Sequence, residues 1–223
     1  MPEPLPQSHE RHRRLWELVA PRSPRDDVAH DVYHLLRVHQ WATRLAPEAG
    51  VDPDLAGAAA LVHDLVDVPK HEKDRPYASE RSAEEARALL RLVGYSDREV
   101  AAVVEAVRTC SWSRGRAATS ELGTVLQDAD RLDAIGAVGV ARVFATAQRM
   151  ASAGKAVRLY HPTDPGALLD RPLDDLRQAA DHFQLKLLKL AEGMHYPSAR
   201  KEAARRHTAL RAYLDELVRE VST

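Results

Sequence analysis

A histidine and an aspartate, His63-Asp64, stand at the end of the apolar run LAGAAALV. Burying an imidazole and a carboxylate after such a run costs free energy unless a metal ion or paired hydrogen bonds compensate for it. An isolated His-Asp pair more often marks a helix end that reaches water, so the pair needs support from elsewhere in the chain. The sequence offers that support at His34 upstream and at Asp130 downstream, both within segments of helical pattern.

These residue types define the chemistry to expect. Two imidazoles and two carboxylates form a mixed nitrogen and oxygen donor set, which suits Mn²⁺, Fe²⁺, Co²⁺, Ni²⁺ or Zn²⁺. Four protein ligands on an octahedral ion leave room for a reactive water and a substrate oxygen. Asp67 follows Asp64 by three residues, and a continuing helical turn would put both carboxylates on one side. The sequence therefore predicts a metal centre able to activate water.

The elements that must position these residues are predicted to be helices almost throughout. Valines in the segment 100–107 recur at the i, i+3, i+4, i+7 spacing of one buried helix face. Ser96 with Glu99 has the spacing of a capping box, and Ser82 with Glu85 marks another helix start. Helices are predicted over residues 9–19, 27–45, 53–65, 82–93, from 96 onward, 120–127, 132–151, 173–190 and 197–218.

The remaining segments are predicted to be loops. No alternating run is long enough to predict a strand, so the expected fold class is all-α. Loops rich in charge, proline or small residues are expected over 67–78, 111–119 and 154–171, and residues 1–8 read as a frayed tail. Loops on a rigid helical scaffold are where ligand contacts usually lie.

The composition of the chain argues against several classes of protein, among them nucleic-acid-binding, disulfide-linked and membrane-spanning proteins. The 223 residues carry 32 Lys and Arg against 33 Asp and Glu, so the chain has no global basic field and no nucleic-acid partner is expected. The single cysteine, Cys110, excludes an internal disulfide and a Cys-rich zinc module and predicts a reducing, cytoplasmic location. The longest apolar runs, 55–62 and 135–140, are far too short to span a bilayer, so no membrane partner is expected.

The order His34, His63-Asp64, Asp130 resembles the signature of the HD-domain phosphohydrolase superfamily. The flanking words are HDVYHLLRV, LVHDLVDVPK, LQDADRLDAIGAVGVARVF and DHFQLKLLKL. Together they are similar to a bacterial subfamily of small stand-alone HD hydrolases that includes manganese-dependent nucleotide pyrophosphohydrolases. The resemblance covers residues 27–206.

The resemblance implies a fold and a set of site residues. The fold would be an all-helical bundle with the metal site between core helices. A single HD domain would occupy 1–223, with its core over 22–150 and a C-terminal loop and helices over 151–223 packing on that core. The implied metal ligands are His34, His63, Asp64 and Asp130. The implied general acid or base is Asp67, and the implied substrate contacts are Lys70, Arg75, Ser79, His182 and Lys186.

One choice among the carboxylates depends on the resemblance. In the superfamily the last metal ligand is the aspartate of the Ala-Asp-Arg-Leu word, which selects Asp130 over Asp128. The implied activity is metal-dependent cleavage of phosphoanhydride or phosphoester bonds in a small phosphorylated metabolite. A nucleotide is favoured, in the manner of a dNTP or NTP pyrophosphohydrolase. The implied cofactor is one divalent ion, with Mn²⁺ favoured over Fe²⁺, Co²⁺, Ni²⁺, Mg²⁺ and Zn²⁺. The oligomeric state is left open, a homo-oligomer included.

Several alternatives stand beside this interpretation. One is a nucleoside 5′-monophosphate phosphatase, and another is a non-catalytic HD module that regulates or binds a ligand. The word HDVYH is similar to the zinc-protease word H-E-x-x-H, but Asp31 replaces the required glutamate. A dinuclear oxygenase or a cyclic-dinucleotide phosphodiesterase would need two further histidines before Asp130, and this interval holds only His71. Cys110 is interpreted as a small pocket-wall residue rather than a nucleophile.

Overall fold

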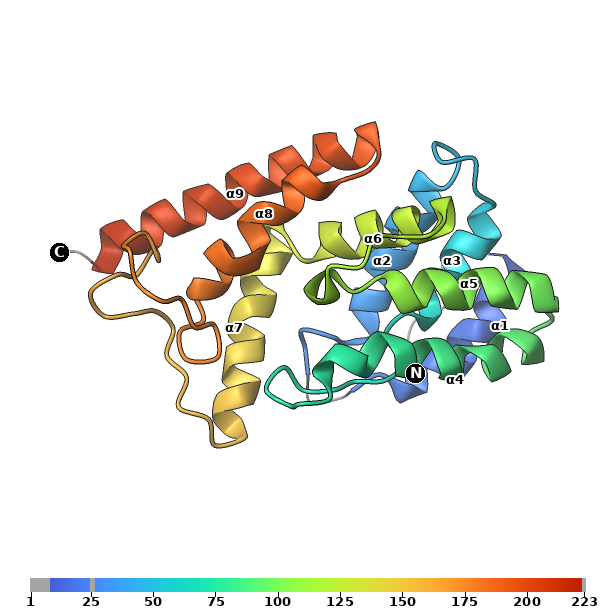
Figure 1. Ribbon diagram of the computed structural model, residues 1–223, viewed down its shortest axis with the longest axis horizontal. Helices are drawn as coiled ribbons and strands as arrows, with labels where there is room; N and C mark the ends of the chain where they lie inside the picture. Colours follow the sequence, from blue (N-terminus) through green and yellow to red (C-terminus); the bar gives the residue numbers. More distant parts are fainter. Residues whose placement is uncertain (1–8, 25–26, 222–223) are drawn as a thin grey trace. The chain divides into compact units, whose positions relative to one another are not determined.

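The computed structural model describes residues 9–24 and 27–221, and these residues form helices joined by turns and loops (Figure 1). Within the described ranges there is no strand. The extended pairing there is limited to two isolated bridges, one between Arg158 and Gln178 and one between His161 and Asp164. The all-α prediction is therefore confirmed. The predicted tail, residues 1–8, lies outside the described residues. Within the same part of the chain, no helix combines the length and the apolar character that crossing a membrane requires.

The chain divides into two compact units. Unit 1 comprises Met1–Arg25 and His30–Arg131, and unit 2 comprises Asp26–Ala29 and Leu132–Thr223. Each unit has fully buried large side chains of its own, among them Leu61 in unit 1 and Phe183 in unit 2. The single HD domain expected from the sequence stays a prediction.

Unit 1 is built around α3. Its helices are α1 (Glu10–Val19), α2 (Val32–Leu45), α3 (Pro53–Val62), α4 (Ala78–Leu92), α5 (Asp97–Thr109) and α6 (Glu121–Asp133), the last two residues of which belong to unit 2. The central helix packs against α1, α2, α4 and α5 (Figure 1). Its residues 56–62 are all buried, and most of them are alanine or glycine, which lets neighbouring helices approach closely. The apolar run before the dyad is therefore a core helix.

Side chains at the helix ends fix where these helices begin. The Asp31 carboxylate accepts a hydrogen bond from the backbone N–H of His34 and caps α2. Asp52 caps α3 in the same way. The predicted capping box of α5 is confirmed, because Ser96 and Glu99 each accept from the other's backbone N–H. The N-cap of α2 therefore lies three residues from a predicted metal ligand and fixes the first turn that carries it.

Three predicted helix boundaries are wrong in this part of the chain. The helix predicted over 27–45 begins only at Val32, where Asp31 caps it. Ser82 does not begin a helix, because the 3-10 helix Arg75–Tyr77 runs directly into α4 and places Ser82 in the second turn. The Ser82 hydroxyl instead accepts a hydrogen bond from the backbone N–H of Val66. The helix predicted over 53–65 ends at Val62, so no helical turn continues from Asp64 to Asp67.

Unit 2 contains α7 (Gly136–Ser152), a π-helical turn (Phe183–Leu187) that continues into α8 (Leu188–Leu190), a 3-10 turn (Ala191–Gly193) and α9 (Pro197–Val221). The helix predicted over 173–190 is therefore wrong in its first half, where the chain forms turns instead. Carboxylates hold those turns in place: the Arg171 guanidinium donates to Asp164 and to both oxygens of Asp181. The predicted break between residues 127 and 132 is also wrong, since α6 continues to Asp133. Gly136, with φ of 78°, opens α7.

A buried polar network joins α1, α2 and α3. His12 Nε2 lies 2.8 Å from the carbonyl oxygen of Asp54, and this bond requires the ring to donate from Nε2. Its Nδ1 then accepts from His39 Nε2 at 3.0 Å. Tyr95 donates its hydroxyl to the Asp54 carboxylate at 3.0 Å. A Cβ at Gly57 would lie 2.2 Å from Cε1 of His12, so only glycine leaves room for this ring.

Both histidines of this network are neutral in the fold. Burial lowers the pKa of His12, and burial together with the neighbouring His12 ring lowers the pKa of His39 to about 4. A proton added to either ring would introduce a charge among groups that already use their hydrogen-bonding atoms. The network should therefore weaken in acid.

We expect the free energy of unfolding to fall as the pH drops from about 6.5, the ordinary pKa of histidine, to about 4, the folded pKa of His39. In that window the unfolded chain binds more protons than the folded chain, so acid favours unfolding. His39→Gln should flatten the slope and remove about 3 kcal/mol of the acid loss. Urea denaturation at pH 4 to 7.5 measures this, with His195→Gln, at an exposed position, as the control. An unchanged slope in His39→Gln would contradict the prediction.

Candidate metal centre

His63 ends α3 with its ring oriented by its own helix. Its Nδ1 lies 2.7 Å from the carbonyl oxygen of Ala60. A carbonyl only accepts hydrogen bonds, so Nδ1 carries the proton and Nε2 of the neutral ring carries a lone pair. A backbone carbonyl bonded to the second ring nitrogen is the usual support of a metal-binding histidine. The residue His63 is only 5% exposed, so its ring cannot turn easily toward solvent.

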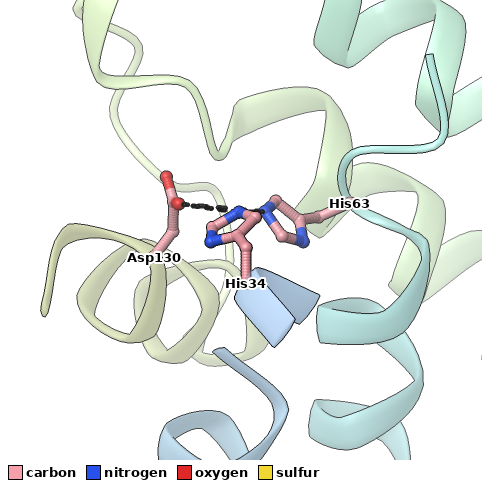
Figure 2. Close-up of side chains that lie close together, drawn as sticks. All are labelled: His34, His63 and Asp130. Atoms are coloured by element: carbon pink, nitrogen blue, oxygen red, sulfur yellow. Dashed lines mark hydrogen bonds and ion pairs between the residues drawn. The ribbon is translucent and has the colours of Figure 1, made fainter. Parts of the chain in front are cut away.

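His34, in the first turn of α2, faces this lone pair. The Nε2 atoms of His34 and His63 lie 3.2 Å apart, and the His34 residue is 1% exposed (Figure 2). Two nitrogens bound to one ion at about 2.1 Å, with a bond angle of about 90° to 110°, would be about 3.0 to 3.4 Å apart. The observed spacing of the two nitrogens thus fits a shared cation.

Asp130 of α6 completes the group. Its Oδ1 lies 3.8 Å from Nε2 of His34 and 3.8 Å from Nε2 of His63. Figure 2 shows the carboxylate pointing toward both rings from a separate helix. In the part of the chain that the structure describes, the donor atoms of these three residues all lie within 4.8 Å of one another. Three chain segments thus present two nitrogens and one oxygen to a common point, and these donors fit a divalent metal ion.

Asp64 lies beside this group but does not belong to the set of three within 4.8 Å of one another. Burial raises the pKa of Asp64, but attraction by His63 and His30 outweighs it, with a further contribution from Arg75. The net effect holds the pKa of this carboxyl well below its usual range, so it is ionised at neutral pH. Its predicted role as a fourth metal ligand stays a prediction.

The structure separates the carboxylates of the DADRLD segment. Asp130 faces the histidines, whereas Asp128 is fully buried away from solvent and interacts electrostatically with Arg131. Asp133 is bound by Arg142 at 2.6 Å within unit 2. Of the two carboxylates that the sequence left to a choice, the structure therefore places Asp130 with the two histidines.

A buried amide that sequence reasoning missed holds the surroundings of Asp130. Gln127, 1% exposed, donates from Nε2 to the carbonyl oxygens of Thr109 and Arg116 at 2.8 and 3.1 Å. Its Oε1 accepts from Arg131 at 2.9 Å. One side chain therefore joins the end of α5, the loop before α6 and the residue that follows Asp130. No sequence signal distinguishes this glutamine from an ordinary polar residue on an amphipathic helix.

Cys110 lines the same region, at the end of α5. Burial raises the pKa of its thiol well above the usual value, and the nearby charges of Asp130 and Asp64 raise it further. The thiol is therefore neutral at physiological pH, which agrees with a small wall residue and not with a nucleophile.

His30 does not form part of a zinc-protease helix. It precedes α2, which begins at Val32, so His30 and His34 do not share a helix face. Its ring packs edge-on against His34, with centroids 6.1 Å apart. The protease interpretation is therefore excluded by the local structure.

The predicted catalytic and substrate residues of unit 1 lie in and after the segment that follows the dyad. Asp67 and Lys70 are half-buried in this segment. Arg75 donates from Nη1 to the carbonyl oxygen of Val68 at 2.8 Å. Ser79 lies in the first turn of α4 and is 7% exposed. Their predicted roles in catalysis and substrate binding stay predictions.

The other two predicted substrate residues belong to unit 2. His182 donates from Nδ1 to the Asp175 carboxylate at 2.6 Å and precedes the π-helical turn, and Lys186 lies within that turn. π-Helical turns occur frequently at functional sites. The roles of His182 and Lys186 in substrate binding stay predictions.

Comparisons with known proteins identify the family of this chain. Residues 31–135 match the model of the HD domain family. The uncharacterized protein YpgQ of Bacillus subtilis (strain 168) is 32% identical over 200 residues, which cover 88% of this chain and 86% of YpgQ. The crystal structure of Bacillus subtilis YpgQ in complex with ADP matches with 30% identity and a TM-score of 0.69, covering 94% of this chain and 97% of that chain. An HD-superfamily hydrolase from Bacillus thuringiensis matches with 29% identity and a TM-score of 0.61, covering 86% of each chain.

We expect His34→Ala and His63→Ala each to weaken Mn²⁺ binding at least about a hundredfold, since the loss of even an outer partner of a metal ligand costs about 10- to 100-fold. Isothermal titration calorimetry on the metal-free protein measures this. Asp64→Asn in the same series tests the fourth ligand. His195→Ala, which removes an exposed imidazole in unit 2, is the control. Wild-type affinity in His63→Ala would reject the centre.

Gln127→Leu should lower the free energy of unfolding by about 2 to 3 kcal/mol, because it leaves the carbonyl oxygens of Thr109 and Arg116 without their donor and removes the acceptor of Arg131. Urea denaturation checks this. Gln148→Leu, at an exposed position of α7, is the matched control and should change stability little. Equal stability of the two variants would contradict the network.

Proposed function

The chain belongs to the HD-domain superfamily of phosphohydrolases, and from this premise we propose that it cleaves phosphoanhydride or phosphoester bonds of a nucleotide in a metal-dependent reaction. A nucleoside triphosphate pyrophosphohydrolase is the favoured form. The observation that carries the proposal is the convergence of His34, His63 and Asp130 on one point. The complex of Bacillus subtilis YpgQ with ADP supports a nucleotide as the ligand class.

The proposed cofactor is one divalent metal ion. His34, His63 and Asp130 would hold it together with Asp64. This mixed donor set suits several divalent ions, and the resemblance to manganese-dependent relatives favours Mn²⁺. When bound, such an ion polarises a phosphoryl oxygen and lowers the pKa of its bound water. The hydrogen bond from His63 Nδ1 to the carbonyl oxygen of Ala60 keeps the Nε2 lone pair directed toward His34, where the ion would bind.

Asp67 is the proposed general acid or base. It follows the dyad in a segment held on both sides by hydrogen bonds: Val66 donates to Ser82, and Val68 accepts from Arg75. A carboxylate held in this way can orient a water molecule or carry a proton without leaving the site. The backbone on either side of this short side chain is thus held in place.

Lys70, Arg75 and Ser79 of unit 1 are proposed to bind phosphate, and His182 and Lys186 are proposed as further substrate contacts. Phosphoryl transfer needs cations and hydrogen-bond donors around the non-bridging oxygens, where the negative charge lies. The Arg75 guanidinium has five N–H donors, of which the bond to Val68 uses one. Electrostatic attraction between Arg75 and Asp64 supports a position of this cation close to the metal centre.

The proposal is tested with a panel of nucleoside mono-, di- and triphosphates in the presence of Mn²⁺. The expected result is release of pyrophosphate from triphosphates. Release of inorganic phosphate from monophosphates would favour the monophosphatase instead, and stabilisation by nucleotides without turnover would favour a binding module.

Asp67→Asn should lower kcat about 100-fold or more while Mn²⁺ affinity is kept, because general acid–base catalysis contributes about 10²- to 10⁴-fold. Steady-state kinetics and calorimetry on one preparation measure both quantities. Asp170→Asn, at an exposed position of unit 2, is the control. Full activity in Asp67→Asn would remove this residue from the reaction.

A further inference from the structure

Between the His63–Asp64 dyad and the first turn of α4, residues 65–79, two side-chain atoms are buried without a hydrogen-bond partner. They are the hydroxyl oxygen of Ser79 and Nδ1 of His71. Ser79 is 7% exposed, and the His71 side chain is 14% exposed. Folded proteins satisfy nearly all buried polar groups, so an orphaned one calls for a partner from outside the chain. Both atoms belong to the region that carries the proposed phosphate-binding residues.

The hydrogen bonds on either side of Ser79 show which segment this part of the helix packs against. Because the 3-10 helix Arg75–Tyr77 continues into α4, Arg75, Ser79 and Ser82 follow one another at spacings of four and three residues and share a helix face. Arg75 donates to the carbonyl of Val68, and Ser82 accepts from the N–H of Val66. Ser79 lies between these two contacts.

This helix face therefore packs along residues 66–68, directly after the dyad. The middle residue of that segment is Asp67, the proposed general acid or base. Arg75 also interacts electrostatically with Asp64. The orphaned hydroxyl of Ser79 consequently belongs to the same wall of unit 1 as the two carboxylates that flank the proposed reaction centre.

His71 lies in the loop that leads into this helix face. Consecutive turns connect it to α4: the N–H of Glu72 donates to Pro69, and the N–H of Arg75 donates to Glu72. The His71 Nε2 lies 3.4 Å from the Glu72 carboxylate, so the orphaned atom is the other ring nitrogen. His71 and Arg75 are four residues apart along these turns.

We propose that Ser79, His71 and Arg75 form an anion subsite for a second phosphate group of the substrate, next to the phosphoryl group held at the metal centre. The inference rests on the proposed function and deepens it. A hydroxyl and a guanidinium supply directed O–H and N–H donors, which match the tetrahedral oxygens of phosphate. The imidazole of His71 adds an N–H at Nδ1 when both of its ring nitrogens carry protons, with Nε2 facing Glu72. A monophosphate bound at the metal would leave this subsite empty. The subsite thus selects substrates with at least two linked phosphates.

The test uses Ser79→Ala and two probes that are not turned over: inorganic phosphate, and imidodiphosphate, in which nitrogen replaces the bridging oxygen. Calorimetry in the presence of Mn²⁺ should show imidodiphosphate binding at least about tenfold more weakly than to the wild type, because a hydrogen bond to a charged group is lost. Phosphate binding should be unchanged. Ser152→Ala, which removes an exposed hydroxyl from α7, is the matched control and should change neither affinity.

The melting temperature without ligand separates a ligand-binding hydroxyl from a structural one. Ala should leave the Tm unchanged or raise it, because it removes a buried hydroxyl that has no partner in the fold. A lower Tm with unchanged affinity for both probes would show that the hydroxyl is structural, or bonded to water alone, and would overturn the subsite. Equal weakening of both probes would also overturn it, by showing one common phosphate site. So would a wild-type protein that binds imidodiphosphate no more tightly than phosphate.

His71→Gln keeps the inference testable if Ser79→Ala fails to fold, because His71 lies in a loop outside the helices. It should also weaken imidodiphosphate selectively, and unchanged binding would count against the subsite. Since the probes report binding alone, the two proposals can fail separately. Selective loss of imidodiphosphate in a protein that hydrolyses no nucleotide would keep the subsite and reject the phosphohydrolase activity. Hydrolysis of triphosphates with unselective binding would do the reverse.

Discussion

The hydrogen bond between Nδ1 of His63 and the carbonyl oxygen of Ala60 sets the chemistry of this protein. α3 ends at Val62, and the first residue beyond it folds its ring back onto a carbonyl that the ending helix leaves unsatisfied. This bond fixes the proton on one ring nitrogen and directs the other at His34. The end of the helix and the orientation of the ligand therefore have a single cause. Without that bond, the two imidazoles would have no reason to meet at 3.2 Å.

The rest of unit 1 keeps that helix end in place. α3 consists largely of small residues, so it contributes few large side chains of its own and depends on close packing with its neighbours. Polar contacts add direction to this packing: His12 and Tyr95 both bond to Asp54 in the first turn of α3. Buried hydrogen bonds such as these, one to the backbone carbonyl and one to the carboxylate of Asp54, are costly to break. The position of the dyad along the helix axis is thus fixed from the opposite end of the helix.

We assign substrate specificity to the segments that connect the helices. The chain after the dyad is held by Arg75 and Ser82, and the loop before α6 is held by Gln127. Glu80 of α4 connects the two regions, since it binds Arg114 and Arg116 at 2.7 and 2.9 Å. Loops fixed in this way on helices can carry binding groups with defined geometry. Because its groups are held in place, the proposed phosphate subsite would distinguish substrates with two or more linked phosphates from monophosphates.

The sequence by itself determined the helical class, the capping box of Ser96 and Glu99, and the family, because short-range spacing and motif order carry this information. It also named the three residues that converge, His34, His63 and Asp130. It misplaced the start of α4 at Ser82, whose hydroxyl is used by Val66 sixteen residues earlier. It extended α3 past Val62 and overlooked Gln127. Only the tertiary structure decided these points, because each depends on which distant backbone group reaches the side chain, and local spacing holds no record of that partner.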